Sequence, residues 1–406
     1  MNNFSLATCF SNRLLEGLDR LNKLYKDKAR VVEVFGSLPK SVIGSGREES
    51  ALPKVSIKGL EDHIKRAHDQ GIKFNYLLNA SCLGNQEYTQ EGQSKIISLL
   101  ELLVSLKVDS VTVALPFFVR LIREHYPQLP VSISVISYVN SVEQALFYQD
   151  LGASRVCLDL DINRDFNLIE EIRKRVSVDL EVLSNNLCLL RCPLRYSHYN
   201  FTAHSTQEGG VPDYPGYPFR DQCSLINLQN LEEFIKSPWI RPEDVSAYTK
   251  RGINIIKIGG RELLSPELLY RAKAYLRGSF EGNLASLLCQ FQFEAEHEKP
   301  LKFIIDNKRL NGFLDFFEAN RCSYQKGCGD CNYCREVAKR VLEIDSSLKE
   351  RYIQILKEKI RRQLYIGGES DLGDDSLGKS PVFGLRERFY SLYQQLFRKM
   401  KKFLKS

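Results

Sequence analysis

The sequence lacks any apolar run that approaches the roughly 20 residues needed by a membrane-spanning helix. Residues 1–9 also lack the basic stretch followed by an apolar core that marks a secretory signal peptide. These absences argue against a membrane-spanning or secreted protein. We therefore expect a protein of the reducing cytoplasm, where cysteine thiolates stay available to bind metal.

A broad basic surface is also missing. The chain carries a net charge of +7, but residues 385–406 alone hold seven Lys or Arg residues and one Glu, a net charge of +6. Subtracting the second value from the first leaves about +1 for the rest of the chain. An extensive nucleic-acid-binding surface on the main domain is therefore not indicated, although a local patch remains open.

Cysteine, in contrast, is plentiful and grouped. Four of the 11 cysteines form the pattern Cys322-x5-Cys328-x2-Cys331-x2-Cys334. Thiolates this close in sequence converge on one soft metal centre, either tetrahedral zinc or an iron-sulfur cluster. A disulfide framework is the alternative, but such frameworks are typical of small secreted chains. The spacing predicts a metal site and leaves zinc and iron-sulfur both open.

Short β-rich runs alternate with amphipathic helical stretches along the first 300 residues or so. The predicted strands are residues 31–35, 74–78, 110–115, 131–136, 155–160, 178–183 and 253–258, with a weaker eighth at 301–305. Apolar strands separated by helices are typical of a parallel sheet. About eight such units predict an α/β fold of the TIM-barrel-like (β/α)8 type, and an open doubly wound sheet is the alternative.

The connection after the sixth predicted strand, residues 184–252, is far longer than the two to six residues usual for such a loop. It contains Cys188, Cys192, His198, His204 and Cys223. Catalytic groups of a TIM barrel lie on loops after the C-terminal strand ends. Cys82 follows the second predicted strand at that same face, nearly opposite in the ring. The insertion must therefore fold over the barrel mouth if the four cysteines are to meet.

Basic side chains near this face are candidates for holding an anion. Arg47 follows Gly44-Ser45-Gly46, and its guanidinium is suited to a carboxylate or phosphate. Lys257 and Arg261, at the end of the seventh predicted strand, offer a second contact of the same kind. The alternatives are an ordinary glycine turn and an ion pair with Glu262 or another neighbour.

Other polar residues of this face have two interpretations each. His198 and His204 are candidates for proton transfer, and packing of the insertion is the alternative. Asp159 and Asp161 end the fifth predicted strand, where a site carboxylate or a helix cap is expected. The remaining cysteines lie in apolar surroundings and are expected to be buried structural thiols, namely Cys9, Cys157 and Cys289.

Several of these segments together resemble the peptidase U32 family, also called collagenase-like, over roughly residues 30–340. They are the run Asn185-Asn186-x-Cys188-x3-Cys192-Pro193-x-Arg195-x2-His198-x-Asn200, the loop Cys82-Leu-Gly-Asn, the step Asp221-x-Cys223 and the segment Trp239-Ile-Arg-Pro-Glu-Asp244. Better-understood members are iron-sulfur proteins of oxygen-independent hydroxylation, acting on tRNA, ribosomal RNA or ubiquinone precursors. Some of them draw on prephenate as the oxygen source. The resemblance implies a [4Fe-4S] cluster held by Cys82, Cys188, Cys192 and Cys223.

The cysteine spacing departs from that of the RNA-modifying members, so the substrate does not carry over. The resemblance implies an oxygen-independent oxidoreductase or hydroxylase acting on an organic, peptide or RNA substrate. A peptidase and a non-catalytic protein that presents a substrate to a partner radical enzyme are the alternatives. Peptidase chemistry is less favoured because the chain has six histidines, no His-Glu-x-x-His and no Gly-x-Ser-x-Gly.

We expect a barrel domain over residues 1–310, followed by a cysteine-rich helical region over 311–366. Residues 367–381 are rich in Gly, Ser and Asp and predict a flexible linker. Residues 382–406 then predict a basic amphipathic helix. Its expected role is peripheral contact with an anionic membrane surface or docking on a partner, and the alternative is a helix folded onto the protein itself.

Overall fold

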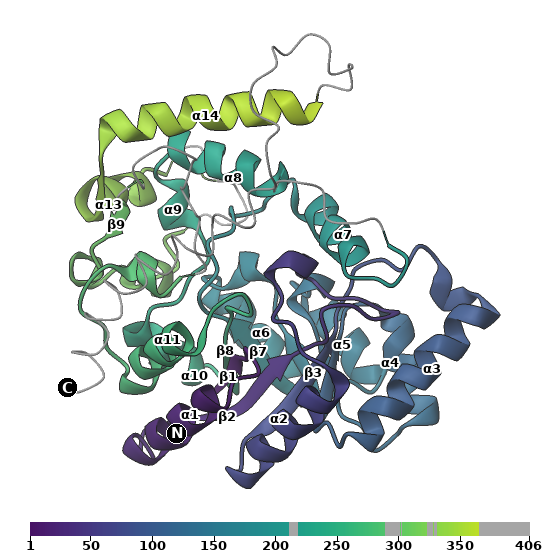
Figure 1. The fold of residues 1–406 in the computed structure, drawn as a ribbon. Helices are drawn as coiled ribbons and strands as arrows, with labels where there is room; N and C mark the ends of the chain where they lie inside the picture. The colour runs from purple at the N-terminus through teal and green to yellow at the C-terminus, as the bar shows by residue number, and fades with distance from the viewer. Residues whose placement is uncertain (211–217, 289–300, 302, 323–327, 329–330, 365–406) are drawn as a thin grey trace, which may run out of the picture.

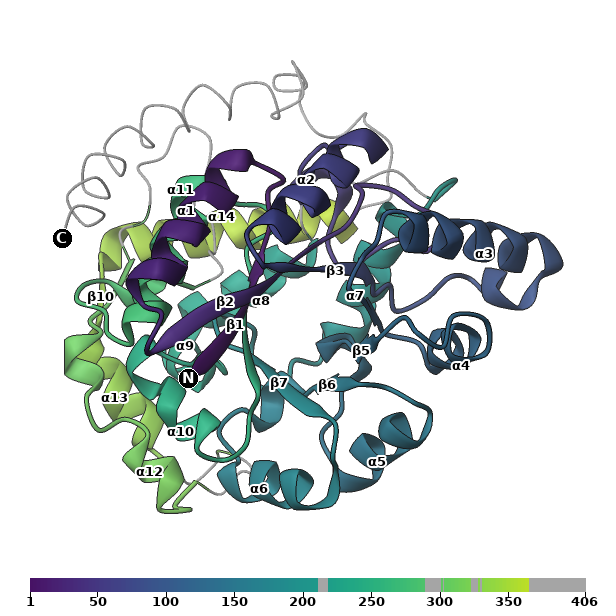
Figure 2. The ribbon, with the colours of Figure 1, turned by 90° about the horizontal axis from the view of Figure 1, so that it is seen from below.

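The computed structural model describes residues 1–210, 218–288, 301, 303–322, 328 and 331–364. Eight parallel strands form a closed barrel in sequence order, and the ring is visible in Figure 2. The strands are β1 (Asn2–Ala7), β2 (Ala29–Gly36), β3 (Lys73–Leu78), β4 (Ser110–Val113), β5 (Val131–Ile133), β6 (Arg155–Cys157), β7 (Asp179–Leu183) and β8 (Ile255–Ile258). β1 pairs with both β2 and β8 and so closes the ring. The predicted (β/α)8 class is confirmed.

Two strand assignments made from the sequence are wrong. The first strand is β1, which the sequence analysis missed because its first residues, Asn2 and Asn3, are polar and mask the apolar run behind them. The predicted eighth strand at 301–305 is instead β9 (Phe303–Ile305), which pairs antiparallel with β10 (Leu342–Ile344) outside the barrel. The long insertion therefore follows the seventh strand, β7, and Cys82 follows the third, β3.

Helices surround the barrel strands, as Figure 1 and Figure 2 show. They are α1 (Asn12–Leu24), α2 (Ile57–Asp69), α3 (Gln90–Ser105), α4 (Pro116–His125), α5 (Val142–Asp150), α6 (Phe166–Arg175) and α11 (Ser265–Arg277). α1 packs against α11, which joins the first and last units of the ring. The first turns of α2, α3, α5 and α6 are held by side-chain caps at Ser56, Thr89, Ser141 and Asp165, each of which accepts a backbone N–H.

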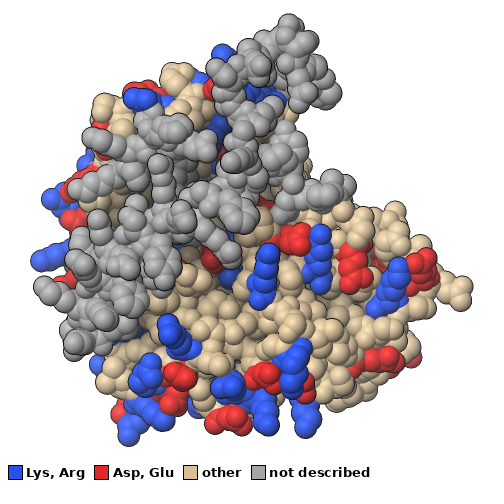
Figure 3. Space-filling model, viewed as in Figure 1, with Lys and Arg blue, Asp and Glu red and all other residues tan. Residues whose placement is uncertain are grey.

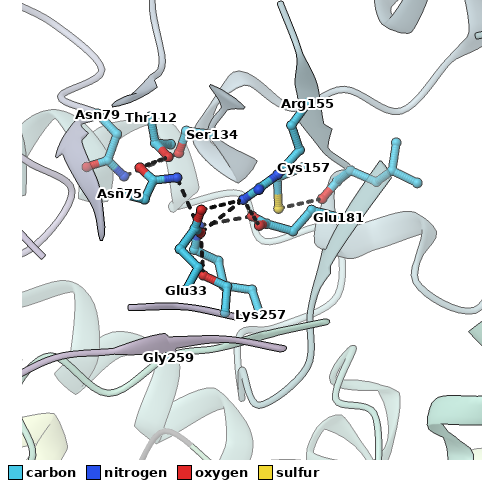
Figure 4. A network of polar contacts seen from close by, with 12 residues as sticks. Glu33, Asn75, Asn79, Thr112, Ser134, Arg155, Cys157, Glu181, Lys257 and Gly259 are labelled. Atoms are coloured by element: carbon cyan, nitrogen blue, oxygen red, sulfur yellow. Dashed lines mark hydrogen bonds and ion pairs between the residues drawn. The ribbon is translucent and has the colours of Figure 1, made fainter. Parts of the chain in front are cut away.

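The barrel interior carries charged side chains in place of the branched apolar residues usual in this fold. Arg155 donates to Glu33 at 2.9 Å and to Glu181 at 3.3 Å, and Lys257 donates to the other oxygen of Glu181 at 2.9 Å. Figure 4 shows these side chains converging. All are largely buried, and the two acids balance the two bases. The network therefore explains Lys257 as a partner of Glu181 inside the barrel.

The insertion contributes α7 (Arg195–Ser205), α8 (Pro218–Gln229), α9 (Glu233–Lys236) and α10 (Val245–Thr249). The C-terminal region adds α12 (Asp315–Glu318), α13 (Tyr333–Val341) and α14 (Ser346–Leu364). α14 packs on α8, and α13 packs on α9, so the C-terminal region rests on the insertion (Figure 1). The predicted linker 367–381 and tail helix 382–406 lie outside the described residues.

The described surface carries charges of both signs. On the face drawn in Figure 3, Lys and Arg side chains alternate with Asp and Glu. Among the described residues, no helix combines the length and apolar character that crossing a bilayer requires.

Candidate functional site

The insertion lies over the C-terminal mouth of the barrel, where its helix α7 binds loops from two strands. Gln207, just after α7, donates its side-chain amide to the carbonyl oxygens of Ile43 and Cys82, at 3.1 and 2.6 Å. Ser81 donates to the side chain of Asn200 at 2.7 Å. The cysteine-bearing insertion and the Cys82 loop are therefore in contact, as the shared-face argument required.

Arg195 fixes the start of α7 to the end of β6. Its guanidinium donates to Asp159 at 2.9 Å and to Asp161 at 2.7 Å, and its side chain is almost fully buried. Asp161 also accepts the backbone N–H of Arg191 at 2.9 Å. Asp159, not Asp161, caps the short helical turn that follows β6. Both aspartates thus hold the segment that carries Cys188 and Cys192.

Three thiols of the first cysteine set are close neighbours in the fold. Burial raises the pKa of Cys223, and the charges of Cys188 and Cys192 raise this pKa further. Arg195 lies beside the same group, where its charge opposes the rise that burial causes in the pKa of Cys192. Single thiols in such surroundings resist deprotonation. A cationic metal centre replaces the thiol protons and offsets the negative charge that results. Neighbouring thiols beside a guanidinium are therefore a donor set suited to such a centre.

Cys82 is less closely tied to this group. Its half-buried sulfur accepts the backbone N–H of Gly84 at 3.3 Å. Across the described ranges, no three His, Cys, Asp or Glu side chains are spaced to hold a metal ion. Convergence of Cys82 with Cys188, Cys192 and Cys223 on one cluster therefore stays a prediction.

The second cysteine set lies at the junction of the insertion and the C-terminal helices. Burial raises the pKa of Cys322 to about 12, and the charges of Cys334, Cys328 and Cys331 add to the rise. Burial likewise raises the pKa of Cys334 to about 11, opposed by the guanidinium of Arg164. The four sulfurs influence one another electrostatically, which is consistent with the predicted local site. Its metal stays a prediction.

The two candidate histidines differ in position. His198 lies 3.8 Å from Glu48 and stacks on Phe219, with ring centroids 5.4 Å apart. Burial opposes ionisation of Glu48, but His198 and the charges of Arg47 and Arg220 lower the pKa of this carboxyl to about 2. His204 is exposed on the far part of α7. The structure thus brings His198 to the mouth beside a buried carboxylate, while His204 points to solvent.

The three residues expected to hold an anion, Arg47, Lys257 and Arg261, do not all lie together in the structure. Arg47 lies 3.6 Å from Glu262, the residue that sequence analysis had paired with Lys257 or Arg261. Arg261 is buried and contacts Ser37 and Ser45. Lys257 belongs to the interior network described above. Arg47 and Arg261 therefore share the mouth, whereas Lys257 lies beneath it.

Sequence analysis missed Glu48 and Tyr138. Glu48 stands next to Arg47, so its position in the same loop was a usable signal. Tyr138 follows β5 with a left-handed φ of 54°, and its buried hydroxyl has no hydrogen-bond partner among the described atoms. Its ring lies 4.6 Å from that of Tyr196 and 6.1 Å from that of Tyr199 on α7. No sequence pattern marked this tyrosine, because its role depends on contacts with the insertion.

Fold and site together define a (β/α)8-barrel protein whose mouth is covered by a thiol-bearing insertion. The sequence profile of peptidase family U32 matches residues 47–204. A protein of Methanocaldococcus jannaschii named uncharacterized protease MJ1657 is 33% identical over 332 residues, which span 82% of this chain and 95% of that protein. The chain belongs to peptidase family U32, as the cysteine and insertion motifs predicted.

Two weaker similarities extend this comparison. The tRNA hydroxylation protein P of Escherichia coli is 29% identical over 125 residues, which cover 31% of this chain and 26% of that protein. The solved structure of the U32 peptidase Mk0906 has a TM-score of 0.47 and 23% identity, and the match covers 63% of this chain and 92% of that chain. The structural similarity is too low to support an argument of its own.

Proposed function

We propose that this chain is an iron-sulfur member of peptidase family U32 that takes part in an oxygen-independent hydroxylation. The observation that carries the proposal is the grouping of Cys188, Cys192 and Cys223 beside Arg195 at the barrel mouth. Cys82, on a loop bound to the same insertion, is the proposed fourth ligand. Similarity to a tRNA hydroxylation protein supports the reaction class, and RNA is one candidate substrate beside organic and peptide compounds.

A bound [4Fe-4S] cluster would supply electron transfer if all four irons had protein ligands, or Lewis-acid chemistry if one iron were open. Arg195 would offset the negative charge of the thiolates and hold their loop through Asp159 and Asp161. His198 would hold a proton at the mouth, oriented by Glu48 and by stacking on Phe219. The insertion itself would exclude water from the site.

A peptidase is less well supported by the described residues. A hydroxyl nucleophile needs a base within hydrogen-bond reach and a third group that orients the base. The Thr8 hydroxyl lies 2.8 Å from His63 Nε2, but both side chains are almost completely buried. The buried Nδ1 atom of His63 has no hydrogen-bond partner in the described part of the chain. This pair therefore lacks both access to a substrate and the orienting group.

The test is anaerobic purification of the full chain, with counts of iron, acid-labile sulfide and zinc and a Mössbauer spectrum. We expect about four irons and four sulfides at the first site. Cys188→Ser, Cys192→Ser and Cys223→Ser should each lose them, whereas Cys9→Ser should retain them. Cys82→Ser decides whether the cluster has three or four protein ligands. A protein that contains zinc without sulfide, or full iron retention in Cys223→Ser, would refute the cofactor.

The reaction class needs a separate measurement. Nucleosides, peptides and small metabolites from anaerobically grown cells with and without the protein can be compared by mass spectrometry. The proposal predicts products that gain one oxygen atom only when the protein is present and its cluster ligands are intact. A partner requirement would appear as activity in cell extract that the purified holo-protein lacks.

A further inference from the structure

Arg261 is placed over the barrel mouth by a tightly held turn after β8. Asn185 accepts the backbone N–H of Gly259 at 2.7 Å and donates to the carbonyl oxygen of Gly259 at 2.9 Å. Gly260 has a φ of 134°, and a Cβ atom there would lie 2.7 Å from the Leu263 side chain. Glycine is therefore needed at this position, and the turn holds Arg261 in one place.

Among the described residues, no carboxylate is in contact with the buried guanidinium of Arg261. Only 6% of the residue is exposed. Its hydrogen bonds within the described chain go to the hydroxyl oxygens of Ser37 at 3.4 Å and Ser45 at 3.2 Å. Both distances are long for hydrogen bonds, and a hydroxyl carries no compensating charge.

Other buried arginines of the protein are compensated differently. Arg155 and Arg195 contact two carboxylates each, and Arg241 forms two bonds with Asp244 at 2.8 Å. Arg164 donates to four backbone carbonyl groups. A buried charge without a bonded counter-charge is strongly unfavourable, so a group that remains charged there implies a missing partner.

The described charged groups around Arg261 are mainly positive. Burial and the neighbouring Arg47 lower the pKa of Arg261 to about 9, while the carboxylates of Glu262 and Glu48 oppose this change. Arg47 and Arg220 act on Glu48, and Arg47 and Arg271 act on Glu262. Among these described residues the positive charges outnumber the negative ones, so an added anion would be attracted to this position.

We propose that Arg261, together with Arg47, binds the carboxylate group of a small-molecule ligand at the barrel mouth. The planar guanidinium of Arg261 matches a carboxylate in geometry and would exchange two long hydroxyl contacts for charge-assisted ones. Arg47, at the rim with about a third of its side chain exposed, provides the second positive charge along the route of entry. This site goes beyond the proposed function, because it requires neither the cluster nor hydroxylation.

The test uses two pairs of probes that differ in charge but hardly in shape, benzoate with benzamide and acetate with acetamide. Binding to the anaerobically purified full chain is followed by calorimetry and by the shift of the thermal unfolding midpoint. We expect the carboxylates to bind and to raise the midpoint, and the amides to have no effect. Arg261→Gln should weaken carboxylate binding by about tenfold or more. Arg120→Gln, an exposed residue with the same change of charge, is the matched control.

A second readout separates ligand binding from a structural role. Without ligand, Arg261→Gln should unfold at the same or a higher temperature than the parent, because it removes an uncompensated buried charge. A lower midpoint would show that the serine contacts stabilise the fold and would overturn the proposal. Equal binding of amides and carboxylates, no response to either carboxylate, or tighter Arg261-dependent binding of inorganic phosphate would also overturn it.

Discussion

Arg195 donates to Asp161 at 2.7 Å and so joins the first turn of α7 to the loop after β6. The two residues are 34 positions apart in sequence. Their contact places the Cys188 and Cys192 segment over the barrel mouth, beside the arginine that offsets thiolate charge. This ion pair thus helps to position Cys188 and Cys192, two of the candidate metal ligands.

We expect Arg195→Met to lower the free energy of unfolding by about 3–5 kcal/mol, because it leaves Asp159 and Asp161 without their buried partner. Urea unfolding of the full chain measures this loss. Arg120→Met, at an exposed position, should change stability by no more than about 0.5 kcal/mol. If the two variants were equally stable, Arg195 would not hold the insertion.

The barrel interior should tolerate loss of a charge pair better than loss of one charge. Glu181→Gln leaves Lys257 and Arg155 undercompensated and should cost about 3–5 kcal/mol. Combining it with Lys257→Met restores neutrality and should cost less than the sum of the two single changes. A double-mutant cycle by urea unfolding provides the measurement, and strictly additive effects would contradict the network.

His63 should make the protein sensitive to mild acid. Burial, together with the charge of Arg66, lowers the pKa of His63 to about 4, below its ordinary value of 6.5. The unfolded chain therefore takes up a proton first as the pH falls, and the folded state loses stability between pH 6.5 and 4. The loss is roughly 3 kcal/mol at about 1.4 kcal/mol per pH unit.

The check is the unfolding free energy measured from pH 7 to pH 4 for the parent and for His63→Phe. The variant should lack this part of the slope, whereas His125→Phe, at an exposed position on α4, should keep it. Parallel curves for the parent and His63→Phe would show that His63 is not the responsible group.

The second cysteine set should bind metal independently of the first. Cys334→Ser should remove about one zinc or one cluster and lower thermal stability, because thiolate-metal bonds would link α13, which carries Cys334, to the preceding segment that carries Cys322. Iron bound by the first set should be unchanged. Elemental analysis of Cys334→Ser beside Cys9→Ser gives the answer. Unchanged metal and stability would mean that these four cysteines bind no metal.

Much of the fold followed from local pattern. Seven of the eight barrel strands were evident as apolar runs between amphipathic helices, because a parallel strand is buried on both faces. β1 was missed because Asn2 and Asn3 hide a four-residue buried run. The run at 301–305 was assigned to the barrel because periodicity shows a strand but not its neighbours. Only the pairing of β9 with β10 placed it outside.

The sequence by itself determined the chemistry available at the site, since the spacing of cysteines and the long connection after β7 can be seen in the chain alone. Tertiary structure decided which residues meet. It sent Lys257 into the barrel with Glu181, left His204 in solvent, and brought Tyr138, Glu48 and Arg261 to the mouth. The physical reason is the distance in sequence over which each effect acts. Residue spacing determines which side chains lie on one helix or strand. Burial and charge compensation arise from contacts between elements that are far apart in the chain.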